Sequence, residues 1–259
     1  MAIEDLLKNP EQYRAGENYK ASNIVFPVEF EGQKYIVKKP RMASSLIEPY
    51  YVLQDKFFLG TRILSTAHQR LGMEAEKLKS LNGLHAPRLV AYDNKILVRE
   101  YLEGRDFRSL DSDEERKSAL ECAIEALIDI HMRGTCIGDA HVKNIFVRNS
   151  NACWLDMDGV YNGAAIDCNL TLIRFGAAMD LLRVVYSTYT ATRNPNLTVY
   201  SAELVAKNGC HVSDGRQTEV GRTIKWAVSK LQAGFGLWFA TRMPRDGKLN
   251  NEIKKIISS

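Results

Sequence analysis

Three polar residues in the middle of the chain constrain its fold more than any other feature. Asp139 and Asn144 lie five positions apart, and Asp156 follows a second short apolar run. The apolar runs at 145–148 and 152–155 are separated by an Asn-Ser-Asn turn, so they predict a β-hairpin. This hairpin would bring Asn144 and Asp156 to the same edge, with Asp139 on the loop just before it.

A long helix is predicted directly before this loop. Ser112 is followed three positions later by Glu115, which is the spacing of a capping box. Apolar residues then recur at helical spacing as far as Gly134, where the helix should end. This stripe comprises Leu120, Ile124, Leu127, Ile128 and His131. Residues 135–144 are therefore expected to form a loop between a helix and a strand.

The rest of the chain divides into a sheet-rich part and a helix-rich part. The predicted strands of the first part are 24–30, 34–38, 89–92 and 96–101. The predicted helices are 44–82 (in two pieces broken near Gly60), 172–192 and 216–258. We therefore expect an α+β fold of two lobes, with an N-terminal lobe at 1–103 and a larger helical lobe at 104–259.

Two charged residues of the N-terminal lobe form a predicted pair. Lys38 lies near the end of a buried strand, and Glu74 interrupts an apolar helical stripe between Leu71 and Leu78. A carboxylate at that position is at least partly desolvated, which is costly unless a cation pairs with it. Strand alternation places Lys38 and Lys39 on opposite faces, so Lys39 remains the alternative partner.

These residue types fit phosphoryl transfer. An aspartate such as Asp139 can accept the proton of an attacking hydroxyl, and the oxygen atoms of Asn144 and Asp156 can bind Mg²⁺. Asp158 is an alternative metal ligand. A lysine held by a glutamate can contact nucleotide phosphates. The segment Glu100-Tyr101 to Gly104 joins the two lobes, and its backbone could bind the adenine of ATP. A phosphate-binding loop is expected around residues 16–22, although no G-x-G-x-x-G motif is present.

Taken together, these motifs resemble the protein-kinase-like superfamily, in particular its small atypical members. Residues 137–144 are similar to the H-G-D-x-x-x-x-N catalytic loop, and 154–158 resemble the metal motif of lipopolysaccharide (Kdo/heptose) kinases. The KEOPS-complex kinase and aminoglycoside phosphotransferases share this pattern. The resemblance implies a two-lobed kinase fold, with Asp139, Lys38 and Glu74 in catalysis, Glu100 and Tyr101 at the nucleotide, and Asn144 and Asp156 at magnesium. Asp180, in the predicted helix 172–192, is expected to support the catalytic loop from behind.

Two departures from the family pattern bear on the acceptor. Ile137 replaces the usual histidine, and Gly138 replaces the arginine with which regulated protein kinases bind a phosphorylated activation loop. Only about a dozen residues separate Asp156 from the next predicted helix. Both favour a sugar, glycan or lipopolysaccharide-type hydroxyl as acceptor. The alternatives are a KEOPS-kinase-like Ser/Thr protein kinase or ATPase acting in tRNA modification, with a protein partner, and a pseudokinase scaffold without catalysis.

Composition sets the remaining expectations. The formal net charge is +4, and no basic block of five or six residues gives a nucleic-acid signature. The five scattered cysteines form no C-x-x-C pair, which suits a reducing compartment. The acidic start of the chain resembles no secretory signal, and no apolar stretch is long enough to span a bilayer. We expect a cytoplasmic protein, with a peripheral position at a membrane left open.

Overall fold

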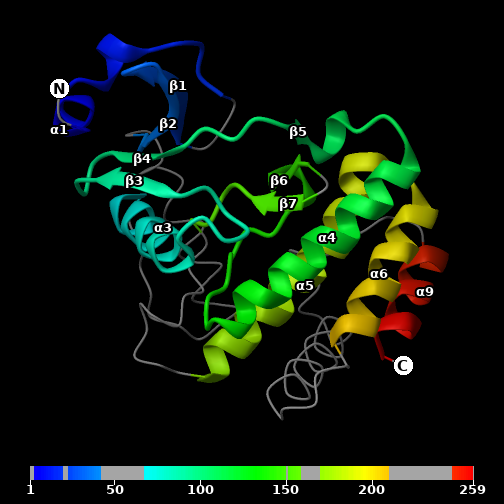
Figure 1. Ribbon diagram of the computed structural model, residues 1–259. Coiled ribbons are helices and arrows are strands. Elements are labelled where there is room, and N and C mark those ends of the chain that lie inside the picture. The colour runs from blue at the N-terminus through cyan, green and yellow to red at the C-terminus, as the bar shows by residue number, and fades with distance from the viewer. Residues whose placement is uncertain are drawn as a thin grey trace. The chain divides into compact units, whose positions relative to one another are not determined.

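The computed structural model describes residues 3–19, 23–41, 67–149, 151–158, 170–209 and 247–258. Over these residues the chain is an α+β protein with a small antiparallel sheet and a helical part, so the predicted fold class is confirmed. The chain divides into two compact units, Met1–Glu103 and Gly104–Ser259. Each unit is described separately below (Figure 1).

Unit 1 is built on a four-stranded antiparallel sheet in the order β1-β2-β4-β3. The strands are β1 (Ile24–Phe30), β2 (Gln33–Lys39), β3 (Leu89–Tyr92) and β4 (Leu97–Glu100). Each agrees with a predicted strand to within about a residue at either end, because both turns have strong signals. Glu31 and Gly32 in the first turn and Asn94 in the second have positive φ angles.

The two faces of this sheet have different compositions. Phe26, Val37 and Val98 lie opposite one another on neighbouring strands and form one buried row. Leu6 packs on this face and completes the core of the unit. The opposite face bears Lys38, and also Arg99, which pairs with Ile36. The second face is mixed, because it also carries the buried residues Val25, Ile36 and Leu97.

Three helical segments are described beside the sheet of unit 1. They are α1 (Ile3–Lys8), the 3₁₀ turn Pro10–Tyr13 and α3 (Ala67–Leu81). The short α1 was not predicted, and it contributes Leu6 to the core. The helix predicted over 44–82 is present as α3, whereas 44–66 and the break near Gly60 lie outside the described residues.

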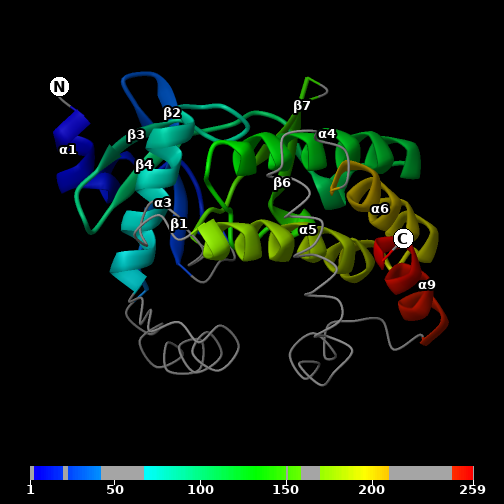
Figure 2. The same cartoon turned by 90° about the horizontal axis from the view of Figure 1, so that it is seen from below.

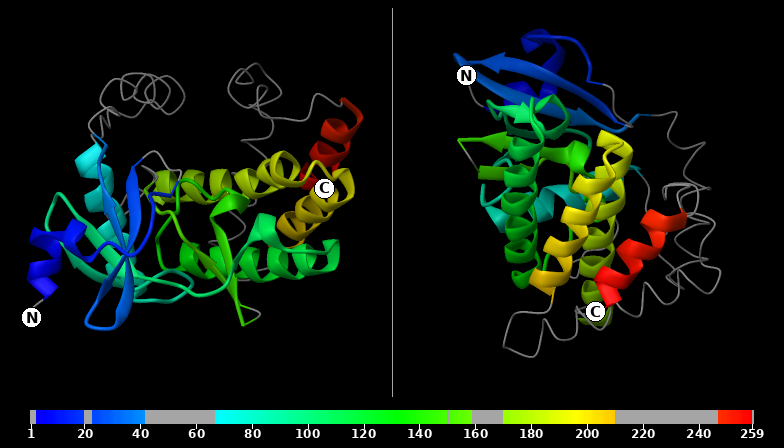
Figure 3. Two further views of the ribbon diagram at one scale, coloured as in Figure 1. Left: turned by 90° about the horizontal axis from the view of Figure 1, so that it is seen from above. Right: turned by 90° about the vertical axis from the view of Figure 1, so that its right-hand side faces the viewer.

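Unit 2 contains four described helices. They are α4 (Asp113–Met132), α5 (Leu170–Thr192), α6 (Pro195–Gly209) and α9 (Gly247–Ser258). Helix α6 packs against α4, α5 and α9, as Figures 2 and 3 show. Within the described parts of the chain, no helix combines the length and apolar character that crossing a membrane requires.

The sequence predicted α4 and α5 well but missed α6. Residues 193–215 were assigned no helix, although α6 occupies most of this range. The start signal is Asn194-Pro195: the Asn194 side chain accepts a hydrogen bond from Leu197 N–H, and proline is favoured in the first helical turn. Of the helix predicted over 216–258, residues 247–258 form α9, and those up to 246 lie outside the described residues.

A small three-stranded sheet in unit 2 carries the hairpin predicted around Asn149. Its strands are β5 (Arg105–Asp106), β6 (Ile145–Arg148) and β7 (Asn151–Trp154), in that order. Trp154 is fully buried, and its indole N–H donates to Ala123 O on α4 at 3.1 Å. This contact fixes the position of the hairpin on α4.

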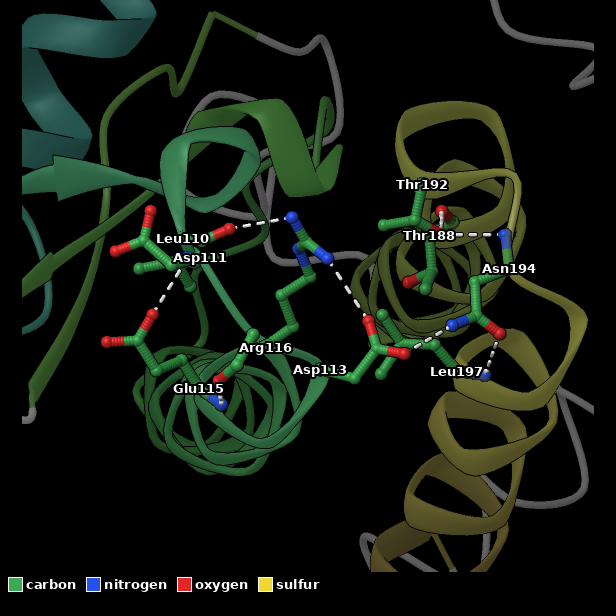
Figure 4. A network of polar contacts seen from close by, with 10 residues as sticks. Leu110, Asp111, Asp113, Glu115, Arg116, Thr188, Thr192, Asn194 and Leu197 are labelled. Atoms are coloured by element: carbon green, nitrogen blue, oxygen red, sulfur yellow. Dashed lines mark hydrogen bonds and ion pairs between the residues drawn. The ribbon is translucent and has the colours of Figure 1, made fainter.

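A polar network joins the start of α4 to the turn between α5 and α6 (Figure 4). Arg116 donates to Leu110 O at 2.6 Å and to Asp113 at 3.1 Å. The other oxygen of Asp113 accepts from Asn194 Nδ2 at 2.7 Å. Ser112 caps α4 by accepting from Glu115 N–H at 3.1 Å, as the capping-box spacing predicted. Asn194 thus caps α6 through its side-chain oxygen and binds the start of α4 through its side-chain nitrogen.

Asn194→Ala is expected to lower the free energy of unfolding by about 1–2 kcal/mol, since it removes a helix cap and a hydrogen bond to a charged group. Chemical denaturation followed by circular dichroism measures this change. Asn208→Ala, at the far end of α6, is the matched control and should cost less. Equal losses in the two variants would contradict the anchoring role of Asn194.

Candidate active site

In unit 1, Lys38 and Glu74 form a buried ion pair. Lys38 Nζ lies 2.5 Å from Glu74 Oε2, and the two residues are 4% and 0% exposed. Glu74 lies within the stripe of Leu71 and Leu78, both of which are buried, as the sequence predicted. The pair joins the end of β2 to the middle of α3. A buried ion pair of this kind is weak evidence for a net gain in stability, although the loss of either partner would leave an uncompensated buried charge.

The structure distinguishes Lys38 from its neighbour Lys39. Lys39 Nζ lies 2.9 Å from Glu11 and 5.3 Å from the centre of the Phe26 ring. These contacts are on the opposite face of the sheet from Glu74, so the pairing preferred from the sequence is the one that forms. The catalytic role of Lys38 and Glu74 remains a prediction.

The predicted nucleotide contacts, Glu100 and Tyr101, lie where β4 ends. The backbone N–H of Glu100 donates to Arg88 O at 2.9 Å, and its side chain accepts from Arg88 N–H at 3.3 Å. The Tyr101 ring lies 5.8 Å from Lys34 Nζ. Because the N–H of Glu100 is bound within the sheet, this group is not the one that would bind a base.

The loop that contains Asp139 begins where α4 ends. Gly134 and Gly138 have φ angles of +76° and +82°, a region that glycine adopts without strain. Gly138 immediately precedes Asp139, and its N–H donates to Asp180 Oδ1 at 2.8 Å. This conformation accounts for glycine at a position where regulated protein kinases carry arginine.

Helix α5 holds this loop through two side chains. Asp180 is fully buried and accepts hydrogen bonds from Ile137 N–H at 2.7 Å and from Gly138 N–H. Ser187, seven positions later on the same helix face, accepts from Val142 N–H at 2.9 Å. The predicted supporting role of Asp180 is confirmed by these bonds.

His131 and Cys136 lie beside Asp180. The His131 Nε2 atom is 3.2 Å from Asp180 Oδ2, and His131 comes from the last turn of α4. The ligand atoms of His131, Cys136 and Asp180 lie within 4.8 Å of one another. Both carboxylate oxygens of Asp180 already accept backbone N–H groups, so structural support of the loop is sufficient to explain this cluster.

Asp139 lies among polar side chains of its own loop. Asn144 Nδ2 donates to Asp139 Oδ2 at 3.2 Å and to Asp139 O at 2.9 Å. His141 Nε2 lies 3.2 Å from Asp139 Oδ1, and Lys143 Nζ lies 3.8 Å from Oδ2. About 30% of the Asp139 side chain remains exposed, which leaves the carboxylate accessible to a substrate.

The pKa of the Asp139 carboxyl group is raised above its ordinary value. Burial is the largest cause, and the negative charge of Asp156 raises the pKa further. Arg183, Lys143 and the hydrogen bond from Asn144 act in the opposite direction. Asp139 and Asp156 therefore lie close enough to repel each other, a repulsion that a cation bound between them would relieve.

The raised pKa predicts how folding stability depends on pH. The folded chain binds a proton at Asp139 more readily than the unfolded chain, so stability should fall as pH rises from the ordinary aspartate pKa through the raised one. Asp139→Asn should flatten this part of the curve in magnesium-free buffer. Denaturant titrations at a series of pH values test this. An unchanged pH dependence in the variant would refute the assignment.

The hairpin brings Asn144 to Asp156, as expected from the sequence. Leu155 N–H donates to Asn144 O at 2.9 Å, and Ile145 pairs with Trp154. Because the amide nitrogen of Asn144 bonds to Asp139, the amide oxygen is the atom available to a cation. An amide and a carboxylate oxygen are ligands that Mg²⁺ prefers, so the donor set fits this ion. Asp156 and Asp158 are both partly buried, so Asp158 remains the alternative ligand.

The structure adds contacts of Asp139 and of Gly16 that the sequence did not indicate. The sequence analysis did not identify His141, Lys143 and Arg183 as neighbours of Asp139. For His141 and Lys143, the available signal was their position two and four residues after Asp139 in the same loop. Gly16, predicted to start a phosphate loop, is adjacent to Pro27 Cγ, which would lie 2.9 Å from an added Cβ. Glycine at this position is thus explained by packing. Residues 20–22 of the predicted loop lie outside the described residues.

Similarity to known proteins is found at the level of structure and not of sequence. No family model matches the chain, and no curated protein matches its sequence. A solved structure described as WaaP in complex with acyl carrier protein is similar to this chain with a TM-score of 0.46 and 12% sequence identity. The match covers 84% of this chain and 90% of that one.

Proposed function

We propose that this chain is an ATP- and magnesium-dependent phosphotransferase of the atypical kinase type. The observation that carries the proposal is the buried ion pair between Lys38 and Glu74. A strand lysine held by a helix glutamate is the arrangement with which kinases orient nucleotide phosphates. The Asp139 loop supports the same proposal independently, because it places a base candidate beside an amide and a second carboxylate.

Each residue has a defined task in this proposal. Lys38, oriented by Glu74, binds the phosphates of ATP. Asp139 orients the acceptor hydroxyl and takes its proton, and its raised pKa makes it a stronger base than an ordinary aspartate. Asn144 and Asp156 would hold Mg²⁺, which would neutralise charge on the phosphates. Asp180 and Ser187 keep the loop in the geometry that these contacts need.

The acceptor that we propose is a hydroxyl of a sugar or glycan, including lipopolysaccharide-type glycans. Gly138 offers no side chain to bind a phosphorylated activation segment, which disfavours the regulated protein kinases. The resemblance of residues 154–158 to lipopolysaccharide kinases favours a glycan. A phosphotransfer screen with labelled ATP over sugars, aminoglycosides, lipid-linked glycans and a generic protein tests this class. Asp156→Ala is the negative control, and transfer to the protein alone would overturn the glycan assignment.

Lys38→Met is expected to reduce magnesium-dependent phosphotransfer by about 10²- to 10³-fold, because it removes a preorganised charge at the phosphates. Lys39→Met is the matched control, since Lys39 is the adjacent lysine on the opposite face and pairs with Glu11. The measurement is the initial rate at saturating ATP, with and without EDTA. Equal activity in the two variants would argue against the proposed function.

A further inference from the structure

The face of the unit 1 sheet that carries Lys38 also carries a second buried cation. Arg99 pairs with Ile36, whereas Lys38 pairs with Leu97, two residues earlier on β4. Diagonal neighbours of this kind lie on the same face, about 7–8 Å apart. Arg99 is only 8% exposed and directly precedes Glu100, at the segment proposed to meet the base of the nucleotide.

Aromatic rings lie beside Arg99. Tyr101 follows it by two residues, with its ring near Lys34. Tyr19 is 46% exposed and bonds by its backbone N–H to Val25, which pairs with Lys38. Burial raises the pKa of the Tyr19 phenol, Tyr101 raises it further and Arg99 lowers it, so Tyr19 lies within electrostatic range of both residues. Such rings are suitable surfaces for stacking a base.

We propose that Arg99 selects the base of the nucleotide, favouring a purine with a carbonyl group at position 6, guanine or hypoxanthine, over adenine. This inference rests on the proposed function, since it concerns the nucleotide whose phosphates Lys38 binds. A guanidinium has five N–H donors and no acceptor. Guanine presents two acceptors to it, O6 and N7, whereas adenine presents a donor, its 6-amino group, in place of O6.

The same geometry explains why adenine would be disfavoured rather than excluded. An amino group directed at the Arg99 guanidinium brings donor against donor, so the adenine amino group would not recover the hydrogen bond that it made to water. ATP remains a donor substrate, because Lys38 and the magnesium-binding residues act on the phosphates that all of these nucleotides share. The proposed selectivity between nucleotides therefore comes only from the contact between Arg99 and the base.

The test measures the affinities of the full chain for ATP, GTP and ITP by competition calorimetry in the presence of magnesium. We expect GTP and ITP to bind about tenfold more tightly than ATP, within the range of one two-point contact of arginine to guanine. ITP lacks the 2-amino group of GTP, so equal binding of the two assigns the selection to O6. Tighter binding of ATP than of GTP would overturn the inference.

Two variants sharpen the test. Arg99→Met should reduce the difference between GTP and ATP to about threefold or less, whereas Lys34→Met, at another cation of this sheet, should leave the ratio unchanged. A ratio that Arg99→Met does not alter would also refute the inference. If Arg99→Met fails to fold, the ratio in the unmodified protein decides. Failure to bind any nucleotide would instead refute the proposed function, and active phosphotransfer with an ATP preference would refute only this inference.

Discussion

Asp139→Asn is expected to lower phosphotransfer by about 10²- to 10⁴-fold, the usual contribution of a general base. Asparagine keeps the size of the side chain and can still bond to Asn144 and His141, but it cannot take a proton from the acceptor. The loss should appear in kcat, with little change in the KM for the nucleotide, because Asp139 is not among the residues assigned to the phosphates. Steady-state kinetics at saturating nucleotide measure it.

The same substitution should leave the fold intact or stabilise it at neutral pH. Burial and Asp156 both disfavour the ionised form of Asp139, so removal of its charge relieves a cost of folding. Asp129→Asn, at a partly exposed aspartate of α4 that contacts Arg133, is the matched control and should leave activity unchanged. A fully active Asp139→Asn variant would eliminate Asp139 as the base and leave the loop without an assigned role.

Asp180→Ala is expected to destabilise the protein by about 3–5 kcal/mol, a large part of the stability of an ordinary domain. The carboxylate is fully buried and accepts two backbone N–H groups, both of which would lose their partner. Thermal and chemical unfolding measure the loss. Asp129→Ala again provides the comparison, because that carboxylate is partly exposed.

A second variant separates the loop from the fold as a whole. Asp180→Asn keeps one carbonyl acceptor for Ile137 or Gly138 but presents an amide donor to the other N–H. It should therefore destabilise less than Asp180→Ala while still displacing Asp139 and reducing kcat. Wild-type kinetics in a stably folded Asp180→Asn variant would contradict the view that Asp180 sets the geometry of the loop.

Sequence patterns predicted the parts of the site that depend on residues close to one another in the chain. The hairpin that joins Asn144 to Asp156 followed from two apolar runs and a turn, and the burial of Glu74 followed from its place in an apolar stripe. Alternation showed that Lys38 and Lys39 face opposite ways, but it could not say which of them meets Glu74. That depended on α3 packing on one face of the sheet and on Glu11 lying near the other.

The contacts that were missed depend on conformation rather than on spacing. His141 and Lys143 reach Asp139 because the loop turns back on itself through a 3₁₀ turn at Val142–Asn144, which no periodicity reveals. Gly16 could equally have marked a phosphate loop or a close contact, and only the position of Pro27 distinguishes the two. Helix α6 was missed because its Asn-Pro start signal was given no weight.

The way in which α5 supports the loop has a consequence for which substitutions the loop can accept. Asp180 and Ser187 bind backbone N–H groups of Ile137, Gly138 and Val142, and every residue except proline has such a group. The shape of the loop is thus largely independent of the side chains at positions such as 141 and 143. If the proposed function holds, substitutions at these two positions would change the surroundings of Asp139 while the backbone of the loop keeps its shape, which makes the loop a favourable place for directed evolution.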